Sequence, residues 1–155
     1  NPAGASYQIL GVYQESLTEI LASVLKNLGT KRAMVVHGMD GIDEITITGK
    51  TKVSELKDGK IETYFIKPED FGLKSYPFDD LKGGNAKENA EFILKIFKGE
   101  QTGAKTDIVL LNSGAAFYIT GMAASIQEGV ELAKKVIKDG KALEKVNLLK
   151  EVSRG

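Results

Sequence analysis

A strand, an amphipathic helix and a second strand follow one another within residues 6–37, and this order constrains the fold most. Residues 6–13 and 32–37 carry apolar runs typical of strands. Between them, Ser16 and Glu19 have the spacing of a capping box, and Gly29 has the position of a left-handed helix stop. The apolar residues between these caps recur at helical spacing: Leu17, Ile20, Leu21, Val24, Leu25 and Leu28. The order predicts a βαβ unit with parallel strands and a right-handed crossover.

The middle of the chain has the pattern of antiparallel strands. Apolar and polar residues alternate over residues 44–48, 52–56 and 61–66. Lys57-Asp58-Gly59-Lys60, between the last two runs, predicts a tight hairpin because Asp-Gly tolerates positive φ. We therefore expect antiparallel strands towards a sheet edge, followed by irregular chain with one helical turn over residues 68–77.

The C-terminal half is predicted to be helical. One helix starts at Asn85, with Glu88 at capping-box spacing, and ends at Gly99. A second covers residues 106–120, a third starts at Ser125 with Glu128 in another capping box, and a fourth covers residues 141–152. No repeat or linker interrupts the chain, so the fold class is α/β: a βαβ unit, antiparallel hairpin strands and a helical C-terminal half.

Composition excludes several kinds of chemistry. The 155 residues contain no cysteine and one histidine, which excludes disulfides, thiolate zinc sites and multi-histidine metal sites within them. Lys and Arg together number 21 and Asp and Glu together 21, so no net charge attracts nucleic acid or an anionic membrane. Without a membrane-length apolar run or a signal peptide, we expect a cytoplasmic setting.

The loop from His37 to Glu44 is the most informative stretch (His-Gly-Met-Asp-Gly-Ile-Asp-Glu). It follows a predicted parallel strand, and ligands of open α/β sheets gather at such strand ends. Its glycines permit a tight loop, in which Asp43 and Glu44 can face one ion. Mg²⁺ prefers one or two carboxylates completed by waters and substrate phosphates. A polar turn between strands is the simpler interpretation of the pattern alone.

Two further features have a structural and a functional interpretation each. His37 is either a structural residue at a strand end or a catalytic imidazole, and the sequence supplies no orienting partner for catalysis. Gly83-Gly84-Asn85 is either a simple helix cap or an anion-binding helix start, but it lacks the Lys-Ser/Thr of a phosphate loop. The structural interpretation is preferred for both.

Small residues lie inside a predicted helix at Asn112-Ser113-Gly114-Ala115-Ala116. Gly114 costs about 1 kcal/mol there relative to alanine, which close helix packing or a substrate-facing surface would offset. A lysine-rich face on the next helix has no aromatic residues among its lysines, which favours a solvated surface over nucleic-acid binding: Lys134, Lys135 and Lys138.

Together, these segments closely resemble anthranilate phosphoribosyltransferases. The matching segments keep their order along essentially the whole chain: residues 1–5 (NPAGA), 8–12 (QILGV), 35–38 (VVHG), 41–45 (GIDEI), 68–72 (PEDFG), 89–90 (NA), 111–116 (LNSGAA) and 128–129 (EG). The resemblance implies the large α/β domain of the fold shared with pyrimidine nucleoside phosphorylases, with residues 1–155 as its C-terminal part. It also implies transfer of a phosphoribosyl group from phosphoribosyl pyrophosphate to anthranilate, in tryptophan biosynthesis.

The resemblance assigns Asp43 and Glu44 to an acidic pair that binds Mg²⁺ beside the pyrophosphate. The family's Gly-Thr-Gly-Gly-Asp loop, its Lys-His-Gly-Asn segment, its anthranilate-contacting arginine and its helical dimerisation domain all lie upstream of the position that matches Asn1. We therefore expect a homodimer when the enzyme is complete, and the upstream part either in the same polypeptide or in a complementary chain.

The first residues support the same expectation. Asn1 is not a usual product of methionine removal, so we expect these residues to belong to a longer polypeptide. Two alternatives stay open: a nucleoside phosphorylase-like enzyme of the same fold, and a fragment without activity of its own.

Overall fold

The computed structural model describes residues 4–153, so the first three residues of the opening Asn-Pro-Ala-Gly-Ala match lie outside the described part. A four-stranded sheet has the order β1-β2-β3-β4. Its strands are β1 (Tyr7–Gly11), β2 (Arg32–Gly38), β3 (Thr51–Lys57) and β4 (Lys60–Ile66). β1 and β2 are parallel, with α1 (Leu17–Asn27) as their crossover, so the βαβ unit is confirmed.

The predicted hairpin is confirmed as well. β2 pairs antiparallel with β3, and β3 with β4, so that Lys57 lies opposite Lys60. Asp58 has φ 50° and Gly59 φ 74°, the left-handed geometry that a two-residue turn between twisted strands requires.

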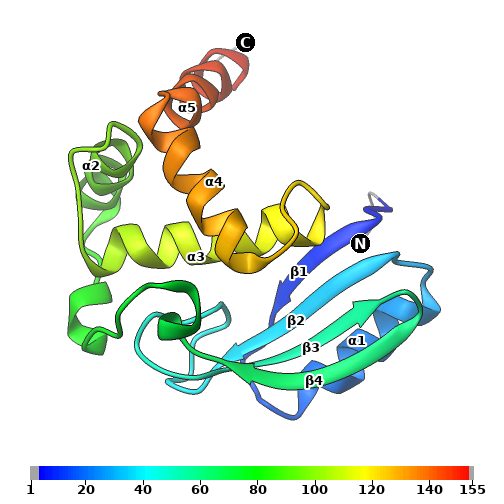
Figure 1. Ribbon diagram of the computed structural model, residues 1–155. Coiled ribbons are helices and arrows are strands. Elements are labelled where there is room, and N and C mark those ends of the chain that lie inside the picture. The colour runs from blue at the N-terminus through cyan, green and yellow to red at the C-terminus, as the bar shows by residue number, and fades with distance from the viewer. Residues whose placement is uncertain (1–3, 154–155) are drawn as a thin grey trace.

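The two faces of the sheet carry different layers (Figure 1). On one face, Ala22 and Leu25 of α1 pack against Ala33, Val35 and Leu56. The other face carries Met34, Val36 and Val53 and lies under α3 (Ala104–Ile119). Ile20 and Val24 of α1 are exposed, as is Leu28 at its C-terminal cap, so only part of the apolar stripe of α1 faces the sheet.

The predicted helical half is confirmed. It consists of α2 (Ala86–Phe97), α3, α4 (Ile126–Lys138) and α5 (Lys141–Val152). The segment predicted as irregular chain has its one helical turn, a 3-10 turn at Pro68–Phe71, and a second 3-10 turn follows it at Phe78–Leu81. Figure 1 shows α3 next to β1 and β2, with α4 against α3 and with α2 and α5 farther from the sheet. Within the described part of the chain, no helix combines the length and apolar character needed to cross a lipid bilayer.

Of the three predicted capping boxes, two are corrected and one is confirmed. Ser16 precedes α1 but has helical φ and ψ and makes no side-chain cap, so its capping box is absent. The Asn85 and Glu88 capping box is complete. That of Ser125 is half formed, because the Glu128 carboxylate accepts from the Ala124 amide instead of from the amide of Ser125.

Residues 44–48 are not a strand, contrary to their alternating pattern. Ile45, Thr46 and Ile47 are buried between sheet and helices, where side chains supply bonds that a strand ladder would otherwise provide. The Ile45 amide donates to Asn112, and the Thr46 amide donates to the Thr51 hydroxyl.

Candidate functional site

The acidic loop, residues 38–48, begins where β2 ends, beside the end of β1. These parallel strands place their carboxyl ends at one edge, which is the ligand side of open α/β sheets. Gly11, at the end of β1, contacts this loop, and a Cβ at this position would overlap the main-chain carbonyl of Asp43. Glycine therefore allows the loop to lie directly on the strand end.

A tight turn opens the loop. The Gly41 amide donates to the Gly38 carbonyl at 2.8 Å, and the Gly38 amide donates to the Ile42 carbonyl at 2.9 Å. Gly41 has φ 99°, a conformation that side chains rarely adopt. The turn brings Asp43 and Glu44 back towards the end of the sheet.

Asp40, although exposed, holds the second half of the loop through its carboxylate. Its Oδ2 atom accepts hydrogen bonds from the Thr46 hydroxyl at 2.5 Å and the Thr48 hydroxyl at 2.6 Å. The Thr48 amide in turn donates to the Thr46 hydroxyl oxygen at 3.0 Å. This role of Asp40 was not predicted, and its only signal in the sequence is the Thr-x-Thr spacing after the acidic pair.

Asn112 of α3 holds the residue that follows the acidic pair. Its Oδ1 atom accepts from the Ile45 amide at 3.0 Å, and its Nδ2 donates to the Ile45 carbonyl at 2.8 Å. The same Nδ2 also donates to the Ile108 carbonyl at 3.0 Å, within the helix. The loop is therefore fixed to the helical layer as well as to the sheet.

Asp43 and Glu44 remain exposed and uncompensated. None of the ion pairs among the described residues involves either carboxylate. The pKa of Glu44 is raised, first because its carboxyl is partly withdrawn from water, and then by the charges of Asp43 and Asp40. The loop thus concentrates negative charge that a bound cation would stabilise.

The donor set fits Mg²⁺ in one specific way. The described residues contain no group of three or more His, Cys, Asp or Glu side chains arranged to hold a metal. Two neighbouring exposed carboxylates match a Mg²⁺ ion that keeps several waters and binds substrate phosphates. Asp43 and Glu44 are therefore the side chains of this loop that could hold such an ion.

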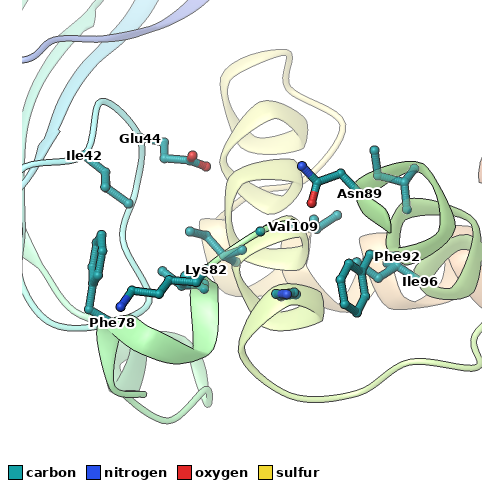
Figure 2. A pocket seen from close by; sticks show the side chains of 13 residues that line it. Ile42, Glu44, Phe78, Lys82, Asn89, Phe92, Ile96 and Val109 are labelled. Carbon is teal, nitrogen blue, oxygen red and sulfur yellow. The ribbon is translucent and has the colours of Figure 1, made fainter. Parts of the chain in front are cut away.

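Glu44 also lines a pocket of about 400 Å³ between the loop, α2 and α3. In Figure 2, the side chain of Glu44 points into this space from the loop, and those of Phe78, Phe92 and Ile96 border it. The remaining wall is largely apolar, and its cationic residues are Lys82 and Lys105. Glu44 therefore lies at the boundary between the polar loop and an apolar pocket.

His37 has the structural role preferred from the sequence. Its ring is buried, and Nδ1 lies 2.8 Å from the Val12 carbonyl, with which it forms a hydrogen bond. This bond connects the end of β2 to the segment between β1 and α1.

The Gly83-Gly84-Asn85 segment is a helix cap, as preferred. The amides that an anion would need are occupied by side chains: Gly84 donates to Asn89, Asn85 donates to Glu88, and Glu88 donates to Asn85.

Close packing explains the small residues of α3. A Cβ at Gly114 would lie 2.7 Å from the Val130 amide nitrogen, and one at Gly129 would overlap the Gly114 carbonyl. The helices α3 and α4 therefore meet backbone to backbone. The three lysines singled out on α4 are all exposed: Lys134, Lys135 and Lys138.

Comparison with known proteins gives the class of this chain. Residues 1–143 match the glycosyl transferase family, a/b domain, and the chain belongs to this family. The resemblance to anthranilate phosphoribosyltransferases is confirmed. The chain is 54% identical over 154 residues to the anthranilate phosphoribosyltransferase of Alkaliphilus metalliredigens, covering 99% of this chain and 45% of that relative.

Solved structures agree with this similarity. Anthranilate phosphoribosyltransferase from Thermus thermophilus superposes with a TM-score of 0.84 at 41% identity, over 92% of this chain and 42% of that one. The Saccharomyces cerevisiae enzyme, solved in complex with PRPP (phosphoribosyl pyrophosphate) and Mg, gives 0.82 at 25% identity, over 91% and 41%. The α/β fold expected from the resemblance is thereby confirmed, and the chain spans less than half the length of each of these relatives.

Proposed function

We propose that this chain carries the Mg²⁺-binding acidic side of an anthranilate phosphoribosyltransferase active site. The enzyme would transfer the phosphoribosyl group of phosphoribosyl pyrophosphate to anthranilate, in tryptophan biosynthesis. The single observation that carries the proposal is the exposed, unpaired Asp43 and Glu44 pair at the carboxyl end of a parallel strand. The similarity of the whole chain to anthranilate phosphoribosyltransferases favours anthranilate over a nucleobase as acceptor.

The chemistry suits a site with two carboxylates. The anthranilate nitrogen forms a bond to the ribose C1 atom, the C1–O bond to pyrophosphate breaks, pyrophosphate leaves with the electron pair, and the nitrogen loses a proton. Bound Mg²⁺ would neutralise charge on the departing pyrophosphate. Asp43 and Glu44 would hold the ion, and the rigid loop would keep both carboxylates in place while charge develops.

The experiment measures anthranilate consumption by loss of its fluorescence, in the full-length enzyme that contains these residues. Asp43→Asn and Glu44→Gln are each expected to lower Mg²⁺-dependent kcat/KM at least ~100-fold, since the charge stabilisation from the metal is worth several kcal/mol. Circular dichroism should show little change in folding. Asp139→Asn, an exposed acidic residue at the end of α4, is the matched control. Normal turnover and normal Mg²⁺ dependence in the Asp43→Asn/Glu44→Gln double variant would refute the assignment.

The same proposal includes the remaining expectations from the resemblance. Residues 1–155 would form the C-terminal part of the large domain, and the complete enzyme would be a cytoplasmic homodimer. The upstream part would supply the pyrophosphate loop and the anthranilate contacts.

A further inference from the structure

The side-chain amide of Asn112 makes three hydrogen bonds to main-chain groups. The amide pairs with both main-chain groups of Ile45, and the second hydrogen of Nδ2 goes to the Ile108 carbonyl. Both donors and one acceptor site of the amide are therefore used. The bridge joins residues 67 positions apart in the sequence.

The bridge acts on the peptide unit next to Glu44. The Ile45 amide belongs to the peptide bond between Glu44 and Ile45, and that bond is planar. Fixing the Ile45 N–H direction therefore restricts the ψ angle of Glu44 and, with it, the direction of the Glu44 side chain. Ile45 itself is 1% exposed and Glu44 is exposed, so the chain passes from core to solvent at this peptide.

No β ladder fixes the direction of the Ile45 N–H, because residues 44–48 are not in a strand. The support behind Asn112 is rigid instead: its neighbour Leu111 is fully buried, and Gly114 of the same helix packs against the α4 backbone. A side chain from a packed helix thus takes the place of a partner strand for the acidic loop.

We propose that Asn112 is a positioning residue for phosphoribosyl transfer. It orients Glu44 towards metal-bound pyrophosphate and itself contacts neither the metal nor the pyrophosphate. This inference rests on the proposed function. Residues that orient metal ligands typically contribute ~10–100-fold to metal affinity or activity.

The test uses the full-length enzyme and two variants of Asn112. Asn112→Leu keeps a similar shape and removes all three bonds, and Asn112→Asp places an oxygen against the Ile45 carbonyl. The binding probe is MnCl₂ with inorganic pyrophosphate, followed by calorimetry without turnover. We expect both variants to bind this pair ~10-fold or more weakly and to need a correspondingly higher Mg²⁺ concentration for half-maximal activity. Amide hydrogen exchange at Ile45 should become faster.

Asn85→Ala is the control for general destabilisation. Asn85 caps α2 by accepting from the amides of Lys87 and Glu88, and its loss costs stability without touching the acidic loop. This control is expected to keep manganese–pyrophosphate affinity within ~2-fold of the unaltered enzyme. The inference is wrong if Asn112→Leu and Asn112→Asp keep that affinity as well.

A double-mutant cycle with Glu44→Gln separates the two proposals. If Asn112 acts through Glu44, Asn112→Asp should have little further effect on metal binding once Glu44 is Gln. Full additivity of the two losses would overturn the positioning role while leaving the metal assignment intact. A Glu44→Gln variant with unchanged metal binding would instead overturn the proposed function, and the positioning role with it.

Discussion

At the scale of single residues, three neighbouring acidic side chains have different tasks. All three are exposed, but only the Asp40 carboxylate accepts hydrogen bonds from side chains of the loop, those of the Thr46 and Thr48 hydroxyls. The hydrogen-bonded carboxylate of Asp40 stabilises the loop, and the carboxylates of Asp43 and Glu44 form no ion pair among the described residues. The loop therefore contains both its own anchor and the candidate metal ligands.

The first prediction concerns this anchor. Thr46→Val should lower the free energy of unfolding by about 1–3 kcal/mol, because it removes a hydrogen bond to a charged group and the acceptor of the Thr48 amide. Urea denaturation measures the change. Thr102→Val, at an exposed threonine, should stay within about 0.5 kcal/mol of the unaltered chain. Equal effects of the two substitutions would contradict the anchoring role.

The second prediction concerns charge at Glu44. Its pKa is raised in the folded state, so folding opposes the ionised carboxyl, and this cost is present at neutral pH. Glu44→Gln should therefore raise the Tm of metal-free protein at pH 7, by the equivalent of up to about 0.5 kcal/mol. The gain should vanish well below pH 4.5, where the carboxyl is protonated in both states. Scanning calorimetry at both pH values checks this, and an equal gain at both would contradict it.

At the scale of elements, the decisive contact is the one between α3 and α4. Their backbones meet at Gly114 and Gly129, neither of which has room for a methyl group. This contact holds α3 in place over the sheet, and α3 carries Asn112 to the acidic loop. Helix packing and loop geometry are therefore linked through one helix.

The third prediction tests this packing. Gly129→Ala should destabilise the fold by about 1–3 kcal/mol, because the added methyl would overlap backbone that has no other position to take. This outweighs the roughly 1 kcal/mol that alanine contributes in a helix interior. Thermal and urea unfolding measure the effect. Lys134→Ala, on the exposed face of α4, serves as the control. Stabilisation by Gly129→Ala would show that the helices can separate at little cost.

At the scale of the whole molecule, elements of both the sheet and the helical layer contact the acidic loop. β1 supports it through Gly11, β2 leads into it, and α3 fixes its far side through Asn112. The described residues nevertheless provide only a pair of candidate metal ligands, and the chain spans less than half the length of its relatives.

The fourth prediction follows at this scale. The isolated 155-residue chain should not consume anthranilate when supplied with phosphoribosyl pyrophosphate and Mg²⁺, because two metal-binding carboxylates do not by themselves position the amine against the ribose. Fluorescence of anthranilate is the readout, and the full-length enzyme is the positive control. Sustained turnover by the isolated chain would show that the upstream motifs are dispensable.

Local patterns in the sequence were sufficient for most elements. The βαβ unit, the Asp58-Gly59 hairpin and the helical half were all predicted, because caps, turns and periodicity act over a few residues. The acidic pair was singled out for the same reason, since a loop after a parallel strand is visible in the sequence. The prediction failed for residues 44–48, where an alternating pattern resembles a strand but the burial has another cause.

The sequence by itself therefore determined most of the elements and their order, and it placed two adjacent carboxylates after a parallel strand. The role of these carboxylates in Mg²⁺ binding comes from the resemblance and belongs to the proposed function. Only the tertiary structure decided how the loop is held: by Gly11 against Asp43, and by Asn112 against Ile45. The physical reason is distance along the chain. Each contact joins segments that are far apart in the chain, residue 11 with residue 43 and residue 112 with residue 45. Local propensity acts over a few residues and does not determine which side chain lies beside which distant peptide group.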